Sequence, residues 1–132
     1  MNMTVEVSIG EFLDKVSILR IKSERINDPE KLKNITKELT ILEDAWANSA
    51  FAQADIASKL AKLKEINERL WEIEDRIRIK EAQKQFDDEF IELARSVYLN
   101  NDERSDVKRE LSFALGSELI EEKSYADYRQ QR

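Results

Sequence analysis

Apolar residues recur along most of this chain in steps of three and four, the spacing that places them on one face of an α-helix. The pattern continues without interruption over residues 56–84, which corresponds to about eight helical turns. The clearest shorter stripe consists of Leu32, Ile35, Leu39, Leu42 and Trp46. This patterning predicts an all-α protein.

The two helices nearest the start of the chain are marked by residues that favour helix ends. Ser8 followed by Glu11 is a capping-box pattern, in which the serine side chain accepts a hydrogen bond from a backbone N–H of the first turn. Asp28-Pro29 combines a good N-cap with a proline at the first helical position. These signals predict one helix over residues 9–27 and another over residues 29–47.

The remaining stripes predict two long helices that form an antiparallel hairpin. The first of them is expected over residues 56–84 and would be about 43 Å long at the usual rise per residue. After a short polar turn, the second is expected over residues 87–116 and ends at a glycine. Because the turn is short, the long helices must fold back on each other. The two shorter helices are expected to pack against this hairpin.

The two ends of the chain lie outside the predicted helices. Residues 1–8 include an alternation of polar and apolar positions, which favours a short extended segment. Residues 117–132 begin apolar and end polar, so this tail is expected to dock at first and then to fray. The whole chain, residues 1–132, is predicted to form a single helical domain.

The overall composition is typical of long helices and argues against one class of partner. Of the 132 residues, 38% are charged, and there are only 2 Gly and 1 Pro. The formal net charge is −6, and a protein that neutralises phosphates needs a basic surface. We therefore expect no nucleic-acid partner.

The residue types that are missing limit the available chemistry. The sequence has no cysteine, which removes disulfides and thiolate metal sites, and no histidine, which removes the commonest general base and many zinc sites. No stretch has the length and apolarity of a signal peptide or a membrane span. We expect a cytoplasmic protein without a membrane partner, and we identify no catalytic residue, metal ligand or cofactor.

Polar residues interrupt the stripes of both long helices at the same level of the hairpin. Continuing the apolar stripes in heptad steps places Asn67 and Glu74 on one helix, and Asn101, Arg104 and Lys108 on the other, where apolar residues would be expected. Pairing the helices about the predicted turn puts Asn67 level with Arg104. The middle of the hairpin is therefore the candidate site.

Three interpretations of this polar level stay open. In the first, it is a buried layer that fixes register, in which Asn67 and Arg104 satisfy each other and Glu74 or Asp102 balances the charge. In the second, it lines a pocket that offers donors and acceptors to an anion or a sugar-like ligand. The candidate ligand-binding residues are Asn67, Arg69, Trp71, Glu74, Asp75, Tyr98, Asn101, Asp102, Arg104 and Lys108.

The third interpretation is magnesium-dependent chemistry on a phosphate chain. Glu68, Glu74, Asp75 and Asp102 are of the residue type that helical nucleotide pyrophosphatases use to hold magnesium. Their spacing is a poor match to the carboxylate sets of those enzymes.

The end of the hairpin nearest its turn carries more apolar residues than an exposed tip normally shows. These are Ile73, Ile77, Ile79, Phe86, Phe90 and Ile91. The two shorter helices are not expected to reach this end. We therefore expect a homodimer or a helical protein partner, and a non-enzymatic interaction module as the first functional hypothesis. The alternative is the small-molecule or anion site described above.

Four segments resemble a family of small bacterial all-helical proteins classed as a domain of unknown function. They are VSIGE at residues 7–11, NERLWEIED at residues 67–75, ARSVYLNND at residues 94–102 and EEKSY at residues 121–125, with Asp14-Lys15 after the first. The likeness extends over nearly the whole chain. It implies no activity, but its motifs coincide with the polar level of the hairpin, which favours the pocket.

Overall fold

The computed structural model describes residues 1–130, and the chain there forms four α-helices. They are α1 (Ile9–Arg25), α2 (Pro29–Ala47), α3 (Ala57–Ala82) and α4 (Asp88–Ala114), followed by a single turn of 3-10 helix, η1 (Tyr128–Gln130). The all-α prediction is confirmed, and every predicted helix boundary lies within two residues of the observed one. No helix among residues 1–130 is both long enough and apolar enough to cross a membrane.

Side chains cap three of the four helices at their N-termini. The side-chain oxygens of Ser8 and Asp28 accept hydrogen bonds from backbone N–H groups of the first turns of α1 and α2, both at 3.1 Å. Asp87 accepts one from the Phe90 N–H at 3.0 Å and begins α4. These bonds satisfy donors that have no partner within the helix.

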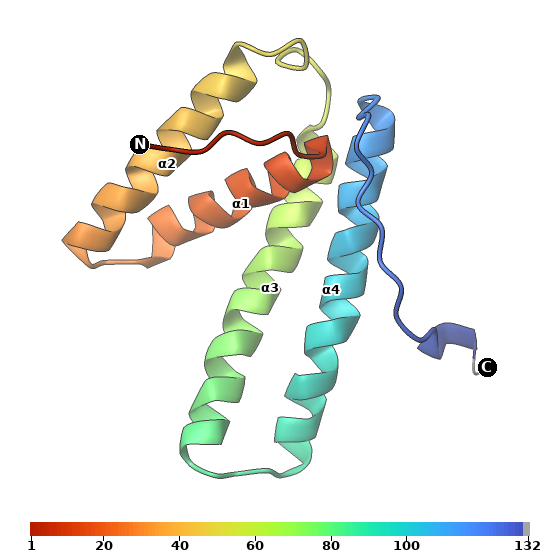
Figure 1. Ribbon diagram of the computed structural model, residues 1–132. Coiled ribbons are helices and arrows are strands. Elements are labelled where there is room, and N and C mark those ends of the chain that lie inside the picture. The colour runs from red at the N-terminus through yellow and green to blue at the C-terminus, as the bar shows by residue number, and fades with distance from the viewer. Residues whose placement is uncertain (131–132) are drawn as a thin grey trace.

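Helices α3 and α4 form the predicted antiparallel hairpin, and α1 lies across it (Figure 1). Helix α1 packs against α2, α3 and α4, whereas α2 packs mainly against α1. Helix α2 reaches the core at the hairpin through Trp46 in its last turn. Because one face alone of α2 is covered, Ile35 is its single buried residue.

The core lies where α1 crosses the hairpin. Its central side chains are almost completely inaccessible to solvent and come from all three helices: Leu13 of α1, Leu63 and Ile66 of α3, and Leu111 of α4. Trp46, in the last turn of α2, packs against this cluster from outside. The crossing therefore fixes the part of the hairpin away from its turn relative to α1.

Gly10 allows α1 and α4 to approach closely. A Cβ at this position would lie 2.1 Å from the backbone oxygen of Lys108, which no side chain can accommodate. The Gly10 N–H also donates to the Ser112 hydroxyl at 2.9 Å. This contact holds the start of α1 against α4 and sets the direction in which the following turns of α1 face.

The tail after α4 runs back along that helix (Figure 1). Ion pairs join it to α4, among them Lys108–Glu121 at 2.8 Å and Lys123–Asp102 at 2.5 Å. The expectation that residues 117–132 dock and then fray stays a prediction, and residues 131–132 lie outside the described residues. Residues 1–7 form no regular secondary structure.

The turn end of the hairpin extends beyond α1 and α2 (Figure 1). Three of its apolar side chains are more than half exposed: Ile79, Phe86 and Ile91. Phe86 contacts Phe90 edge to face, with ring centroids 5.2 Å apart. Self-association through this end stays a prediction.

Candidate functional site

A buried carboxylate of α1 lies at the centre of the polar level. Asp14 is 1% exposed. Its Oδ1 accepts hydrogen bonds from Asn67 Nδ2 at 2.9 Å and from Arg104 Nε at 3.0 Å, and its Oδ2 accepts one from Arg104 Nη2. Asn67 and Arg104, which the sequence places level with each other, are thus joined through a residue of a third helix.

This arrangement corrects the charge balance expected from the sequence. Glu74 pairs with Arg78 and Asp102 pairs with Lys123, so neither compensates Arg104. The compensating charge comes from α1, because that helix crosses the hairpin at this level. Sequence reasoning about the hairpin missed Asp14, although the family-like segments include it.

A signal for Asp14 does exist in the sequence. Gly10, Asp14 and Ser17 follow each other in steps of four and three, the same spacing as the apolar stripe of their helix. All three are buried, and they form a face of small and polar residues that meets the hairpin. That face predicts a close and polar contact, but it does not identify the partner.

Asn67 leaves one hydrogen-bonding group unused. Its amide nitrogen donates to Asp14 and, at 3.3 Å, to the Ser17 hydroxyl. Its amide oxygen accepts no hydrogen bond from residues 1–130. Among residues 1–130, every side-chain nitrogen or oxygen that is fully enclosed has a hydrogen-bond partner. Because the oxygen of Asn67 has none, it is not fully enclosed and is open to the space beside it.

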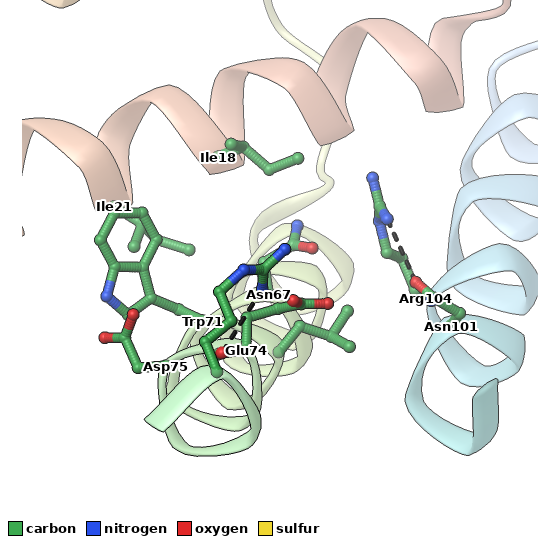
Figure 2. Close-up of a pocket in the computed structure, with 10 residues that line it drawn as sticks. Ile18, Ile21, Asn67, Trp71, Glu74, Asp75, Asn101 and Arg104 are labelled. Carbon is green, nitrogen blue, oxygen red and sulfur yellow. Dashed lines mark hydrogen bonds and ion pairs between the residues drawn. The ribbon is translucent and has the colours of Figure 1, made fainter. Parts of the chain in front are cut away.

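That space is a cavity of about 480 Å³ between α1, α3 and α4. Figure 2 shows Asn67 and Arg104 pointing toward α1, with Trp71 on the opposite side of the cavity. The lining has an apolar part and a polar part. The apolar part is Ile18, Ile21, Leu70 and Trp71, and the polar part is Asn67, Glu74, Asp75, Arg78, Asn101 and Arg104.

Six of the ten candidate residues therefore line one cavity. They are Asn67, Trp71, Glu74, Asp75, Asn101 and Arg104. The other four lie on other faces of the hairpin. Arg69 bonds to Glu65, Asn100 and Glu103, and Tyr98 contacts Tyr128. Asp102 pairs with Lys123, and Lys108 pairs with Glu11 and Glu121. The four other residues that line the cavity were not among the candidates: Ile18, Ile21, Leu70 and Arg78.

Arg104 is held as a fixed cation at the inner end of the cavity. The hydrogen bonds to Asp14 raise the pKa of Arg104 above its usual value, and they outweigh the opposite effect of burial. Its Nη1 also donates to Asn101 Oδ1 at 3.3 Å. A guanidinium has five N–H groups, so these three bonds leave one on each terminal nitrogen.

Lys108 connects this site to both ends of the chain. Its Nζ lies 2.6 Å from Glu11 Oε2, 2.8 Å from Glu121 Oε2 and 3.8 Å from Asp14 Oδ2. Burial lowers the pKa of Lys108, but the hydrogen bonds to Glu11 and Glu121 and the negative charges of Asp14 and Glu11 together raise it more, so the net shift is upward. Lys108 is therefore a structural cation beside the cavity.

The carboxylates of the magnesium interpretation do not converge. Glu68 pairs with Arg25, Glu74 with Arg78 and Asp102 with Lys123. Within residues 1–130, no three Asp, Glu, His or Cys side chains are placed to hold one metal ion. The arrangement thus offers hydrogen bonds to a ligand and no metal cluster.

Fold and site together define an all-helical protein with a polar cavity at the crossing of one helix and a long hairpin. The model of a family of unknown function, DUF6165, matches residues 3–129, so the chain belongs to this family, and the resemblance to a domain of unknown function is confirmed. No curated protein and no solved structure matches the chain significantly.

Proposed function

We propose that this protein binds a small polar molecule in the cavity between α1, α3 and α4. The observation that carries the proposal is the set of unused hydrogen-bonding groups at its inner end. The amide oxygen of Asn67 and two N–H groups of Arg104 have no partner in the described chain, although Asp14 fixes both side chains. A cytoplasmic location, in keeping with the absence of cysteine, is part of the proposal.

A purely structural layer would not need this arrangement. Buried polar groups that only fix register are stable when every donor and acceptor is paired inside the protein. Here the pairing to Asp14 orients the two side chains and leaves their remaining groups facing an open cavity. Fixed groups lose little conformational entropy when a ligand binds, which favours a binding site.

A thermal-shift screen of purified protein tests this proposal. The probes are neutral sugars, sugar phosphates, nucleosides, amino acids and polyamines. The variants are Trp71→Ala and Asn101→Ala, which remove one wall and one polar group of the cavity. Arg69→Ala is the matched control, because it lies on α3 near the same level but outside the cavity.

The expected result is a melting temperature that rises with at least one probe in the wild type and in Arg69→Ala, and that rises less in the two cavity variants. The proposal is wrong if no class of probe changes the melting temperature. It is equally wrong if the shift is the same in Trp71→Ala and Asn101→Ala as in the wild type, because the ligand would then bind elsewhere.

Self-association is the second candidate function. It is supported by the exposure of Ile79, Phe86 and Ile91 at an end of the hairpin that no other helix of residues 1–130 covers. A second copy of the chain is the proposed partner. The two functions are compatible, since the cavity lies nearer the middle of the hairpin.

A further inference from the structure

We propose that the ligand is a neutral polyhydroxylated ring, a sugar or a sugar-like polyol, an inference that rests on the proposed binding function. Three features of the cavity support it: the mixture of free donors and acceptors at the inner end, the balance of charge, and the apolar wall formed around Trp71. Each excludes a different kind of ligand.

The inner end of the cavity presents an acceptor and donors close together. The acceptor is the free amide oxygen of Asn67, and the donors are the remaining N–H groups of Arg104, held on the same carboxylate. A hydroxyl group can donate one hydrogen bond and accept others at the same time. A phosphate or a carboxylate accepts only, and an ammonium donates only, so neither satisfies both residues.

Both arginines that line the cavity are already paired with carboxylates without a ligand. Asp14 neutralises Arg104, and Glu74 pairs with Arg78 one turn further along α3. Asp75 adds a negative charge and has no ion pair among residues 1–130. An anionic ligand would therefore meet a net negative charge in this cavity, because both arginines are paired and Asp75 is not. A neutral ligand meets no such repulsion.

One side of the cavity is apolar and includes an indole ring. Trp71 lies beside Ile21, and both face the cavity (Figure 2). A sugar ring has faces made of C–H groups, which can lie against an aromatic surface while the hydroxyls at the edge reach polar groups. The volume of about 480 Å³ is within the range of small-molecule sites.

Asn101 completes the polar side. Its amide oxygen accepts the hydrogen bond from Arg104, and its amide nitrogen donates to no residue of the described chain. It is exposed, so it can be substituted without disturbing the core. A second hydroxyl of the ring could accept from this nitrogen.

The test is a titration of isotopically labelled protein followed by two-dimensional NMR, with ligands that share a ring and differ in charge. The neutral members are methyl glycosides of several hexoses. The anionic members are the hexose 6-phosphates and the hexuronic acids, and the cationic member is a hexosamine. Each titration is repeated at low and high salt, which screens binding that depends on net charge.

The expected result is that at least one neutral glycoside shifts the signals of Trp71 and Asn101, with an affinity that does not depend on salt. Its phosphorylated and aminated counterparts should bind at least about tenfold more weakly. Trp71→Ala and Asn101→Ala should each weaken binding by about tenfold, Trp71→Phe by less, and Arg69→Ala should bind as the wild type does.

Two other outcomes overturn the inference in different ways. The ligand class is wrong, and the binding function stands, if another kind of ligand binds this cavity more tightly than any neutral glycoside. Such a ligand could be an anionic or cationic member of the series, or a nucleoside or amino acid from the thermal-shift screen. If no probe of any charge shifts the cavity signals, both the class and the binding function are wrong.

Discussion

Arg104 of α4 donates hydrogen bonds to both carboxylate oxygens of Asp14, which lies ninety residues earlier on α1. The two side chains differ in exposure: that of Asp14 is 1% exposed, and that of Arg104 is 26% exposed. The pair therefore joins the inside of the helix crossing to the wall of the cavity. It links the stability of the fold to the geometry of the proposed binding site.

Removing the carboxylate alone should be strongly destabilising. Asp14→Ala removes the acceptor of both the half-buried Arg104 and the buried Asn67. Breaking a buried ion pair by removing one partner costs about 3–5 kcal/mol. Urea denaturation followed by circular dichroism measures the loss in the free energy of unfolding. Glu74→Ala is the matched control, because its exposed pair with Arg78 should contribute less than about 1 kcal/mol.

The double substitution Asp14→Leu with Arg104→Leu should recover most of that loss. Apolar residues of similar volume often replace a buried ion pair at little cost. Recovery would show that the loss in Asp14→Ala arises from the uncompensated charge. A double variant as unstable as Asp14→Ala would contradict this explanation and would mean that the pair itself contributes net stability.

A methyl group at Gly10 should separate α1 from α4. The Cβ of Gly10→Ala would lie 2.1 Å from the Lys108 backbone oxygen, and overpacking of this kind typically costs about 1–3 kcal/mol or more. Gly116→Ala is the comparison. The new Cβ would meet no atom within 4 Å, but the backbone of Gly116 has a left-handed φ of 69°. A residue with a Cβ in this conformation costs about 1–2 kcal/mol. Denaturant midpoints should fall further for Gly10→Ala. A smaller effect there than at Gly116 would contradict the close contact.

The helices were predictable because their signals are local. Each cap and each turn of an apolar stripe lies within a few residues, so the boundaries follow from Ser8, Asp28-Pro29 and the stripes themselves. It was also predictable that Asn67 and Arg104 lie at the same height along the hairpin, because a short turn between two long antiparallel helices fixes which residues lie opposite each other.

The role of Asp14 was not predictable in the same way. It depends on where α1 crosses the hairpin, and that crossing is set by the contact of Gly10 with Lys108 and with Ser112, 102 residues later in the chain. No pattern within either helix contains this information. The division of the candidates between the cavity and other faces, as for Trp71 and Arg69, depends on the same crossing.

Acid should release the tail from α4. The hydrogen bond from Lys123 lowers the pKa of Asp102, and that from Lys108 lowers the pKa of Glu121. A carboxylate whose pKa is lowered in the folded state stabilises the docked tail when the pH is above the ordinary pKa of that carboxylate. The ordinary pKa is 3.8 for Asp102 and 4.5 for Glu121. The stabilisation decreases once the pH falls below these values, and it is lost as the pH passes through the lowered pKa of the folded state.

NMR signals of residues 117–130, followed as the pH is lowered, measure this release. They should move toward the positions of an unstructured chain before the signals of the core do. Lys123→Ala should weaken docking already at neutral pH, and Lys31→Ala, on the exposed start of α2, should not. A tail that stays docked until the core itself unfolds would contradict the electrostatic account.

Self-association through the turn end of the hairpin should make the protein dimeric at micromolar concentrations. Burying apolar surface is the main favourable term in association, and Ile79, Phe86 and Ile91 are the large apolar side chains exposed at this end. Size-exclusion chromatography with light scattering gives the mass directly. The variant Phe86→Ser with Ile91→Ser should shift the mass toward that of a 15.5 kDa monomer.

Ile41→Ser provides the control for this experiment. Ile41 is 50% exposed, close to the 51% of Ile91, but it lies on α2, away from the hairpin turn. If apolar exposure anywhere on the surface promotes association, both variants will lower the mass. If the hairpin end is the interface, only the Phe86/Ile91 variant will do so, while the circular dichroism of both stays helical. A wild-type protein that elutes as a monomer at high concentration would contradict the dimer and leave the cavity as the remaining functional feature.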